Sequence, residues 1–325
     1  MKAPYTLKNQ CFLFLAIATF IFSAQLFAEP YAFITNQLDN TVSVIDAQTH
    51  KVIKTIEVTG KPVGVAVNDK MDRVYISTPN GGGFAVLDSK KLQKIDSVEV
   101  GGASLGIAVD VKGQRIFVAD WYENTVSVFD AQTLKLKKTI KVGKSPSGMM
   151  VSLDGRWLYV ANRVDDTISQ IDLKKLKIRN TTKVGKHPFG LTVNKKGDRV
   201  YTANVESDDV NVMDTGGGRL KRLLTIKVGE RPYATTLALN DSLLFVTNQD
   251  DSTVSVIDTV SLKQIAEIEV GEKPEGISTH PDDQHIYVAN WFDNNVSVID
   301  AKTLKVIETI ETGEGSRAFG LFFSR

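Results

Sequence analysis

The sequence predicts an all-β fold, a seven-bladed β-propeller made of four-stranded antiparallel blades. Two observations support this fold. A strand-like phrase returns seven times, with its last residue at positions 36, 78, 120, 162, 204, 248 and 290, so the period is 42 residues with one step of 44. Each repeat also holds four short runs rich in Val, Ile, Tyr and Thr, separated by Gly, Pro, Asn and Asp.

The first 28 residues precede the repeats and have the layout of a secretory signal peptide. Lys2 and Lys8 are followed by the uncharged apolar stretch 12–22 and by a small residue, Ala28. A retained membrane anchor is the alternative, but the apolar stretch is shorter than the roughly 20 residues that a spanning helix needs. The sequence therefore predicts a signal peptide at 1–28, a propeller at 29–325, and a periplasmic or secreted protein with no membrane span in the mature chain.

One repeat shows the predicted strands in order, at residues 148–151, 158–161, 167–172 and 179–184. Alternation with period two, as in Thr41-Val-Ser-Val-Ile-Asp46, is typical of a strand. The repeats begin with a second-strand phrase at residue 31 and end with a first-strand phrase at 320–323. The C-terminal strand should therefore join the N-terminal three strands and close the ring, and deletion of the last six residues should open it.

The repeated phrases also resemble a known family. Tyr-Val-Ala-Asn at 159–162, Val-Ser-Val-Ile-Asp at 42–46 and the link Val184-Gly-Lys-His-Pro-Phe-Gly190 are similar to the YVTN family of β-propeller repeat proteins. The resemblance covers nearly all of residues 31–325 and implies an exported bacterial protein. Some similar proteins are implicated in binding single-stranded DNA, and more distant seven-bladed relatives are lactonases and antibiotic lyases.

Composition excludes several classes of chemistry. The only cysteine, Cys11, lies in the predicted signal, so the mature chain has no thiol nucleophile and no disulfide. The net charge of +1 becomes −1 when Lys2 and Lys8 are removed, which leaves 37 basic and 38 acidic residues. A polyanion would therefore have to be bound by a local patch. No histidine pair shows metal-ligand spacing backed by a third donor, so the sequence predicts no metal and no cofactor.

Asp, Asn and Gly residues that recur from repeat to repeat are interpreted as structural. Asp at the end of each third strand should accept hydrogen bonds from backbone amides of the following turn. Asn at the end of the second strand should satisfy the loop that follows, and Gly at the start of the first strand should let the backbone crowd the axis. These residues are Asp46, Asp88, Asp130, Asp172, Asp214, Asp258 and Asp300; Asn36, Asn162, Asn204, Asn248 and Asn290; and Gly64, Gly106, Gly148, Gly190, Gly276 and Gly320.

Function should lie where the repeats differ, on the loops of one face. Links between blades share a face with the loops that join second and third strands, and several of these positions are basic or aromatic. Acidic residues later in the same loops should form an outer rim. The predicted ligand-binding residues around the mouth of the central channel are Trp121, Arg163, His187, Arg231, Lys273, Trp291 and Arg317.

Two functions compete for this face. The first is a non-catalytic binding or scaffold protein, with no catalytic residue, whose partner is single-stranded nucleic acid, a glycan, a peptide or a protein held by stacking and charge. The alternative is a lactonase- or lyase-like enzyme with His187 as general base and Glu275 or Glu123 as its partner. A third reading is a structural envelope component that another protein recognises. We expect a monomer and, on balance, no enzymatic activity.

Overall fold

The protein is described by a computed structural model, which covers Met1, residues 30–110 and residues 112–324. The predicted signal peptide therefore lies outside the described residues, apart from Met1. The described residues form 28 β-strands, which pair antiparallel within the blades, and two short 3-10 turns, η1 (Pro79–Gly81) and η2 (Gly216–Gly218), with no α-helix among them. The prediction of a seven-bladed all-β propeller is confirmed. None of the described helices is long and apolar enough to cross a membrane.

Each blade is a meander in which consecutive strands pair. Blade 1 holds β1 (Tyr31–Asn36), β2 (Thr41–Asp46) and β3 (Lys51–Glu57); blade 2 holds β4 (Gly64–Asn68), β5 (Arg73–Thr78), β6 (Gly83–Asp88) and β7 (Gln93–Glu99); blade 3 holds β8 (Ser104–Val109), β9 (Arg115–Asp120), β10 (Thr125–Asp130) and β11 (Leu136–Lys141); blade 4 holds β12 (Pro146–Val151), β13 (Trp157–Asn162), β14 (Thr167–Asp172) and β15 (Lys177–Lys183).

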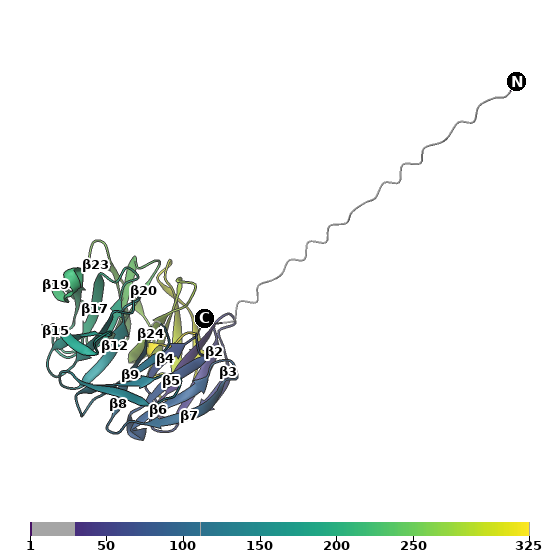
Figure 1. The fold of residues 1–325 in the computed structure, drawn as a ribbon. Coiled ribbons are helices and arrows are strands. Elements are labelled where there is room, and N and C mark those ends of the chain that lie inside the picture. The colour runs from purple at the N-terminus through teal and green to yellow at the C-terminus, as the bar shows by residue number, and fades with distance from the viewer. Residues whose placement is uncertain (2–29, 111, 325) are drawn as a thin grey trace.

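The remaining three blades follow the same order around the ring (Figure 1). Blade 5 holds β16 (Pro188–Val193), β17 (Arg199–Asn204), β18 (Asp209–Asp214) and β19 (Lys221–Lys227); blade 6 holds β20 (Pro232–Ala238), β21 (Leu243–Asn248), β22 (Thr253–Asp258) and β23 (Lys263–Glu269); blade 7 holds β24 (Pro274–Thr279), β25 (His285–Asn290), β26 (Asn295–Asp300) and β27 (Lys305–Glu311).

The C-terminal segment closes the ring beside the first blade, as predicted. Phe33 N donates to Phe322 O (2.9 Å) and Ser324 N donates to Tyr31 O (2.9 Å), so residues 322–324 run along β1. The short strand β28 (Phe319–Leu321) also pairs in parallel with β4 of blade 2. This second pairing arises because the innermost strands of neighbouring blades converge at the axis.

Burial follows the radial arrangement. Second and third strands are buried on both faces, because each blade packs against the blade on either side, whereas outer strands such as β3 and β7 are mostly exposed and carry Lys and Glu. The predicted crowding at the axis is present: a Cβ on Gly106 would collide with Ser147 O, and one on Gly276 with Arg317 O. Glycine is therefore needed where inner strands of adjacent blades touch.

The recurring Asp and Asn residues hold the strand ends. Asp46 Oδ1 accepts from Gln48 N and Thr49 N, both at 2.9 Å, which confirms the predicted turn. The Asn residues behave differently from the prediction. Asn248 Nδ2 donates to hydroxyls of the third strand, Thr253 Oγ1 (3.0 Å) and Ser255 Oγ (2.9 Å), and does not serve the next loop. The amide instead ties two neighbouring strands together inside the blade.

Candidate functional site

The links between blades and the loops after the second strands meet at one end of the propeller, which we name the mouth face. A repeated backbone bond holds them together: the first residue after a second strand donates its N–H to the link residue just before the first strand. The pairs are Trp121 with Ala103, Arg163 with Ser145, Val205 with His187, Gln249 with Arg231, and Trp291 with Lys273, at 3.0 to 3.1 Å. All seven predicted ligand-binding residues lie in or beside these segments.

The link residues share a strained backbone. His187, Arg231 and Lys273 have φ values of 53°, 51° and 54°, in the left-handed region. Acidic residues of the preceding loop stabilise this backbone conformation: Asp166 Oδ1 accepts from His187 N (2.9 Å), and Asp208 Oδ1 accepts from Arg231 N (3.0 Å). Lys61 and Ser145 have the same conformation, so it belongs to the repeat and is not specific to the site.

Four aromatic rings cover the axis at the mouth face. The Phe189 ring lies 4.0 Å from Tyr233 and 4.9 Å from Phe319 between centroids, and Trp121 lies 6.4 Å from Phe189. The Arg163 guanidinium sits 5.6 Å from the centre of the Trp121 ring, a cation–π distance. We name Trp121, Phe189, Tyr233 and Phe319 the mouth cluster. Phe189, Tyr233 and Phe319 are buried, so these three rings form a plug rather than an open platform.

A buried ion pair lies beside the mouth cluster. Arg317 Nε contacts Glu275 Oε2, Arg317 also donates to Tyr233 Oη (2.8 Å), and Gln249 Nε2 donates to Glu275 Oε1 (2.6 Å). Burial raises the pKa of the Glu275 carboxyl, although Arg317 opposes the shift. The Glu275 charge raises the pKa of Arg317 against the effect of burial, so the guanidinium stays cationic. Arg317, predicted as a ligand contact, is occupied by this network.

Arg231 and Lys273, two further predicted ligand-binding residues, share one carboxylate on the mouth face. Lys273 Nζ lies 2.7 Å and Arg231 Nε 3.6 Å from Asp250 Oδ1. Their side chains are 33 % and 40 % exposed, so both remain open to a solute. Asp250 directly follows Gln249, which connects this pair to the buried Glu275.

The predicted partner of His187 was wrong. Its Nδ1 lies 2.6 Å from Glu206 Oε1, not near Glu275 or Glu123. Glu206 is carried by the loop between β17 and β18, and Val205 N bonds to His187 O, so the loop brings the carboxylate against the imidazole. The same loop contains Asp208, whose carboxylate accepts a hydrogen bond from Arg231 N. The loop therefore contacts both His187 and the link that carries Arg231.

Trp291 and several acidic residues make local contacts on the mouth face. Trp291 stacks on Phe292 (4.7 Å between centroids), whereas Trp121 belongs to the mouth cluster. Several of the acidic residues that were predicted to form an outer rim bind link backbone. Asp165 accepts from Lys144 N, Asp251 from Glu230 N and Asp293 from Glu272 N, at 2.6 to 2.9 Å.

Two cavities lie near the axis and the mouth face. The one between the inner strands, lined by residues such as Met149, Met150 and Phe319, has a volume of about 30 Å³, enough for about one water molecule. The other, of about 450 Å³, opens between blades 2 and 3 and is lined in part by Glu99, Asp120 and Glu123. Neither of these two cavities is lined by His187, Arg231 or Lys273.

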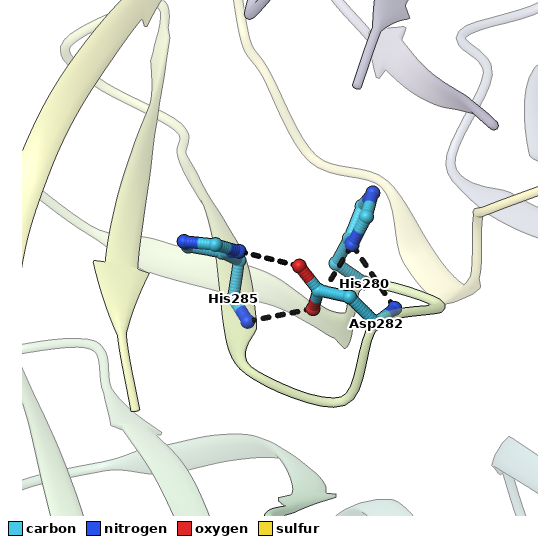
Figure 2. Close-up of side chains that lie close together, drawn as sticks. All are labelled: His280, Asp282 and His285. Carbon is cyan, nitrogen blue, oxygen red and sulfur yellow. Dashed lines mark hydrogen bonds and ion pairs between the residues drawn. The ribbon is translucent and has the colours of Figure 1, made fainter. Parts of the chain in front are cut away.

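A second group of polar side chains lies at the opposite end of the propeller. His280, Asp282 and His285 lie in and beside the turn between β24 and β25, with candidate ligand atoms all within 4.8 Å of one another (Figure 2). The expectation that no histidine pair has a third donor was therefore wrong. The sequence signal that was missed is His280-Pro-Asp-Asp-Gln-His285, read as a link without regard to its folded-back turn.

Family profiles identify the relatives of the chain. The profile described as "Cytochrome D1 heme domain" matches residues 27–152 and 232–318, well over half of the chain. The chain belongs to the cytochrome D1 heme domain family. A second profile, "Lactonase, 7-bladed beta-propeller", matches residues 131–230 of this cytochrome D1 family member. No curated protein sequence matches it.

Solved structures share the fold of this cytochrome D1 family member. Hydrazine synthase of Kuenenia stuttgartiensis is 20% identical with a TM-score of 0.74, over 82% of this chain and 91% of that one. The periplasmic gluconolactonase of Pseudomonas aeruginosa is 18% identical with a TM-score of 0.75, over 91% and 99%. Dihydro-heme d1 dehydrogenase NirN, in complex with DHE, is 15% identical with a TM-score of 0.68, over 86% and 63%.

These comparisons correct two expectations. The matched families and the structures just named are enzymes or domains of enzymes, which contradicts the prediction of a non-catalytic binding or scaffold protein without enzymatic activity. They favour the alternative, a propeller enzyme. The two family matches are to seven-bladed propeller families, and they agree with the observed blades.

The described residues of this cytochrome D1 family member do not fit the heme that the family name implies. The mouth cluster and the Glu275–Arg317 pair fill the axis, and the cavity beneath is far smaller than the 300 Å³ or more, roughly, of a typical ligand pocket. The larger cavity offers no His, Cys, Met or Tyr among its lining residues as an axial ligand.

Proposed function

We propose that the protein is a hydrolase of lactones, the cyclic esters of hydroxy acids, and that it works on the mouth face. The observation that carries the proposal is the pair of His187 Nδ1 and Glu206 Oε1 at 2.6 Å, on a surface that also presents Arg231 and Lys273. The region matched by the lactonase profile, 131–230, contains His187, Glu206 and Arg163. The similarity to a gluconolactonase structure supports the fold on which such a site would stand.

His187 is the proposed general base. The Glu206 carboxylate lies 2.6 Å from His187 Nδ1, and its negative charge favours the neutral tautomer that carries the proton on Nδ1 and a lone pair on Nε2. His187 and Glu206 side chains are 26% and 42% exposed, so water can reach Nε2. Nε2 would take a proton from water as the water oxygen bonds to the lactone carbonyl carbon. The ring C–O bond then breaks, the proton passes to the departing alkoxide, and an open hydroxy acid results.

The cations around His187 suit the charges of this reaction. Arg231 and Lys273 are partly exposed and share one carboxylate, Asp250, so these two cations outnumber the acid that they both contact. Such groups stabilise the negative oxygen that develops on the carbonyl and attract a substrate that carries a carboxylate. Arg163 lies over Trp121 at the edge of the mouth cluster and offers a surface against which a sugar ring can pack.

The setting of this activity is also a proposal. Lys2, Lys8 and the apolar stretch before residue 29, together with the YVTN-type repeats, support an exported enzyme that acts in the periplasm or outside the cell. A sugar lactone would reach such an enzyme directly. The predicted nucleic-acid or protein partner stays a prediction.

The test is hydrolysis of glucono-δ-lactone and a panel of γ- and δ-lactones by residues 29–325, followed as acid release in a pH-stat above the spontaneous rate. We expect His187→Gln to lower kcat/KM by about 10²- to 10⁴-fold, because proton transfer is lost. The matched control is His50→Gln: His50 also has a carboxylate, Glu308, at 2.6 Å, but lies outside the mouth face, so activity should not change. Failure of the wild type on every lactone would exclude the function, whereas full activity in His187→Gln would exclude only the base.

A further inference from the structure

Three of the four histidines of the chain lie at the end opposite the mouth face, where blade 7 meets blade 1. His280 follows β24, Asp282 lies in the turn and His285 begins β25, and all three side chains converge (Figure 2). Asp282 Oδ2 is 2.6 Å from His285 Nδ1, and Asp282 Oδ1 is 3.0 Å from His280 Nδ1. Metal–ligand bonds of about 2.0–2.2 Å place neighbouring ligand atoms roughly 3 to 3.5 Å apart, so small side-chain rotations would convert these contacts into a ligand set around one ion.

Hydrogen bonding leaves His280 unsatisfied in either neutral tautomer. Asp282 N donates to His280 Nδ1 (3.1 Å), while His280 Nε2 is buried without a hydrogen-bond partner among the described residues. If the proton is on Nε2, it has no acceptor, and the Nδ1 lone pair faces the Asp282 carboxylate. If the proton is on Nδ1, the bond from Asp282 N is lost. A cation between Nδ1 and Oδ1 would convert this pair of facing acceptors into two ligands.

The three side chains are held in place by the surrounding fold. The His280 ring stacks on Tyr287 (18° between planes) and meets the edge of Phe323 at 5.3 Å. Asp282 Oδ1 accepts from Gln284 N (2.7 Å) and His285 N (3.1 Å), which fixes the carboxylate over the turn. A donor set that the fold holds together binds metal at a smaller reorganisation cost than three free side chains would.

The turn between the first and second strands of a blade forms without histidine in other repeats. The same turn, with the same backbone N–H to C=O bond, joins Asp110 to Arg115, Ser152 to Trp157 and Asn194 to Arg199 at 2.9 to 3.1 Å. Blade 3 stabilises its turn with an Asp110–Arg115 ion pair at 2.7 Å. Blade 7 places an imidazole at each of the two positions and a carboxylate between them, and so gives up that ion pair.

We propose that His280, Asp282 and His285 form a binding site for a divalent first-row transition metal ion, with Zn²⁺ as the reference ion. Two imidazole nitrogens and one carboxylate oxygen suit Zn²⁺, Co²⁺, Ni²⁺ or Cu²⁺, whereas Mg²⁺ and Ca²⁺ prefer oxygen ligands throughout. Asp282 and His285 side chains are 32% and 30% exposed, so solvent can complete the coordination. Because His280 packs on Phe323 of the closing segment, the bound ion also stabilises the closed ring.

The experiment uses residues 29–325 without a histidine tag, dialysed against EDTA and then against buffer. Titration with Zn²⁺ in a calorimeter should show one equivalent bound, Co²⁺ should give a visible d–d spectrum, and the melting temperature should rise with Zn²⁺. Asp282→Asn keeps an acceptor for the turn but removes the anionic ligand. We expect it, and His285→Gln, to raise the dissociation constant for Zn²⁺ by about tenfold or more.

The control is His50→Gln, because the His50 ring lies 6.3 Å from His285 but its Nδ1 is occupied by Glu308. It should bind Zn²⁺ within about twofold of the wild type, since ligand contacts decide affinity. Absence of saturable binding of Zn²⁺ to the wild type would overturn the proposal. So would unchanged affinity in both Asp282→Asn and His285→Gln, or a tenfold loss confined to His50→Gln.

Discussion

At the scale of single residues, the buried Glu275–Arg317 ion pair fixes the position of the last link at the mouth face. The Glu275 side chain is 4% exposed and the Arg317 side chain 18%, and Tyr233 and Gln249 satisfy further atoms of the pair. Removing two charges from water is costly, and the cost is offset only while both partners and their hydrogen bonds are present. The pair therefore locks the last link against the mouth cluster, and the partly exposed His187 and Arg231 remain within reach of a solute.

Arg317→Ala should destabilise the fold by about 3–5 kcal/mol at neutral pH, because Glu275 is left as an uncompensated buried carboxylate. The loss should shrink as the pH falls. Burial already raises the pKa of Glu275, and removal of Arg317 should raise this pKa further. Below the raised pKa, Glu275 of the folded variant is protonated and neutral, so no buried charge is left unpaired. As the pH rises through that pKa, the carboxylate ionises and the loss of stability returns. Urea denaturation at pH 5 and pH 8 measures the difference.

Lys273→Ala is the matched control for this prediction. Its partner Asp250 is 34% exposed, and solvent screens the pair, so the loss should be about 1 kcal/mol or less with little dependence on pH. An equal loss in both variants at pH 8 would show that the buried pair has no special weight.

At the scale of the strand and its turn, the recurring Asp is the common device. Asp300 Oδ1 accepts from Lys302 N (2.9 Å) and Thr303 N (2.7 Å), and the Thr303 hydroxyl also bonds to it. The Thr303 N–H in particular, with the hydroxyl and Lys302 N–H, lowers the pKa of Asp300 despite some burial. Asp130, Asp172 and Asp258 repeat the arrangement, so the turn after each of these third strands is fixed by the carboxylate that precedes it.

Asp300→Ala should lower the melting temperature at pH 7, and the difference from wild type should narrow as the pH falls toward 3. The folded pKa of Asp300 lies below its ordinary value of 3.8, so its stabilisation is present above 3.8 and is lost as pH falls through the folded pKa. Asp300→Asn, which keeps an acceptor for the turn, should lose less. A difference between Asp300→Ala and wild type that grows in acid would contradict this account.

Sequence periodicity predicted the strands well because the local pattern of apolar and polar residues specifies each strand. Residues 167–172 were predicted as a strand and form β14, and the run at 148–151 begins two residues earlier, at Pro146. The site was less accessible from sequence. His187 meets Glu206 through a loop of the next blade, and Glu275 meets Arg317 across a full repeat. Which loop residue turns inward depends on packing between blades, and the repeat pattern contains no information on that choice.

At the scale of the whole molecule, stability depends on closing the ring. Every blade buries both faces against its neighbours, so blade 1 needs the C-terminal segment on its inner side as much as it needs blade 2. Phe322 and Phe323 enter the core cluster that contains Phe33 and Tyr287, which joins the two ends of the described propeller. The two sites proposed above lie at opposite ends of this ring, and neither needs the other to form.

Phe322→Ala should destabilise the propeller by about 3–5 kcal/mol, because Phe322 is 0% exposed and its loss leaves a cavity at the seam. The neighbouring Leu321→Ala is the control: that side chain is 53% exposed, so its loss should change stability by about 0.5 kcal/mol or less. Deletion of residues 320–325 removes the part of the segment that runs along β1 and should lower the melting temperature more than Phe322→Ala, with earlier hydrogen exchange in β1 than in β13. A deletion variant that melts with the wild type would mean that the ring holds without its C-terminal segment.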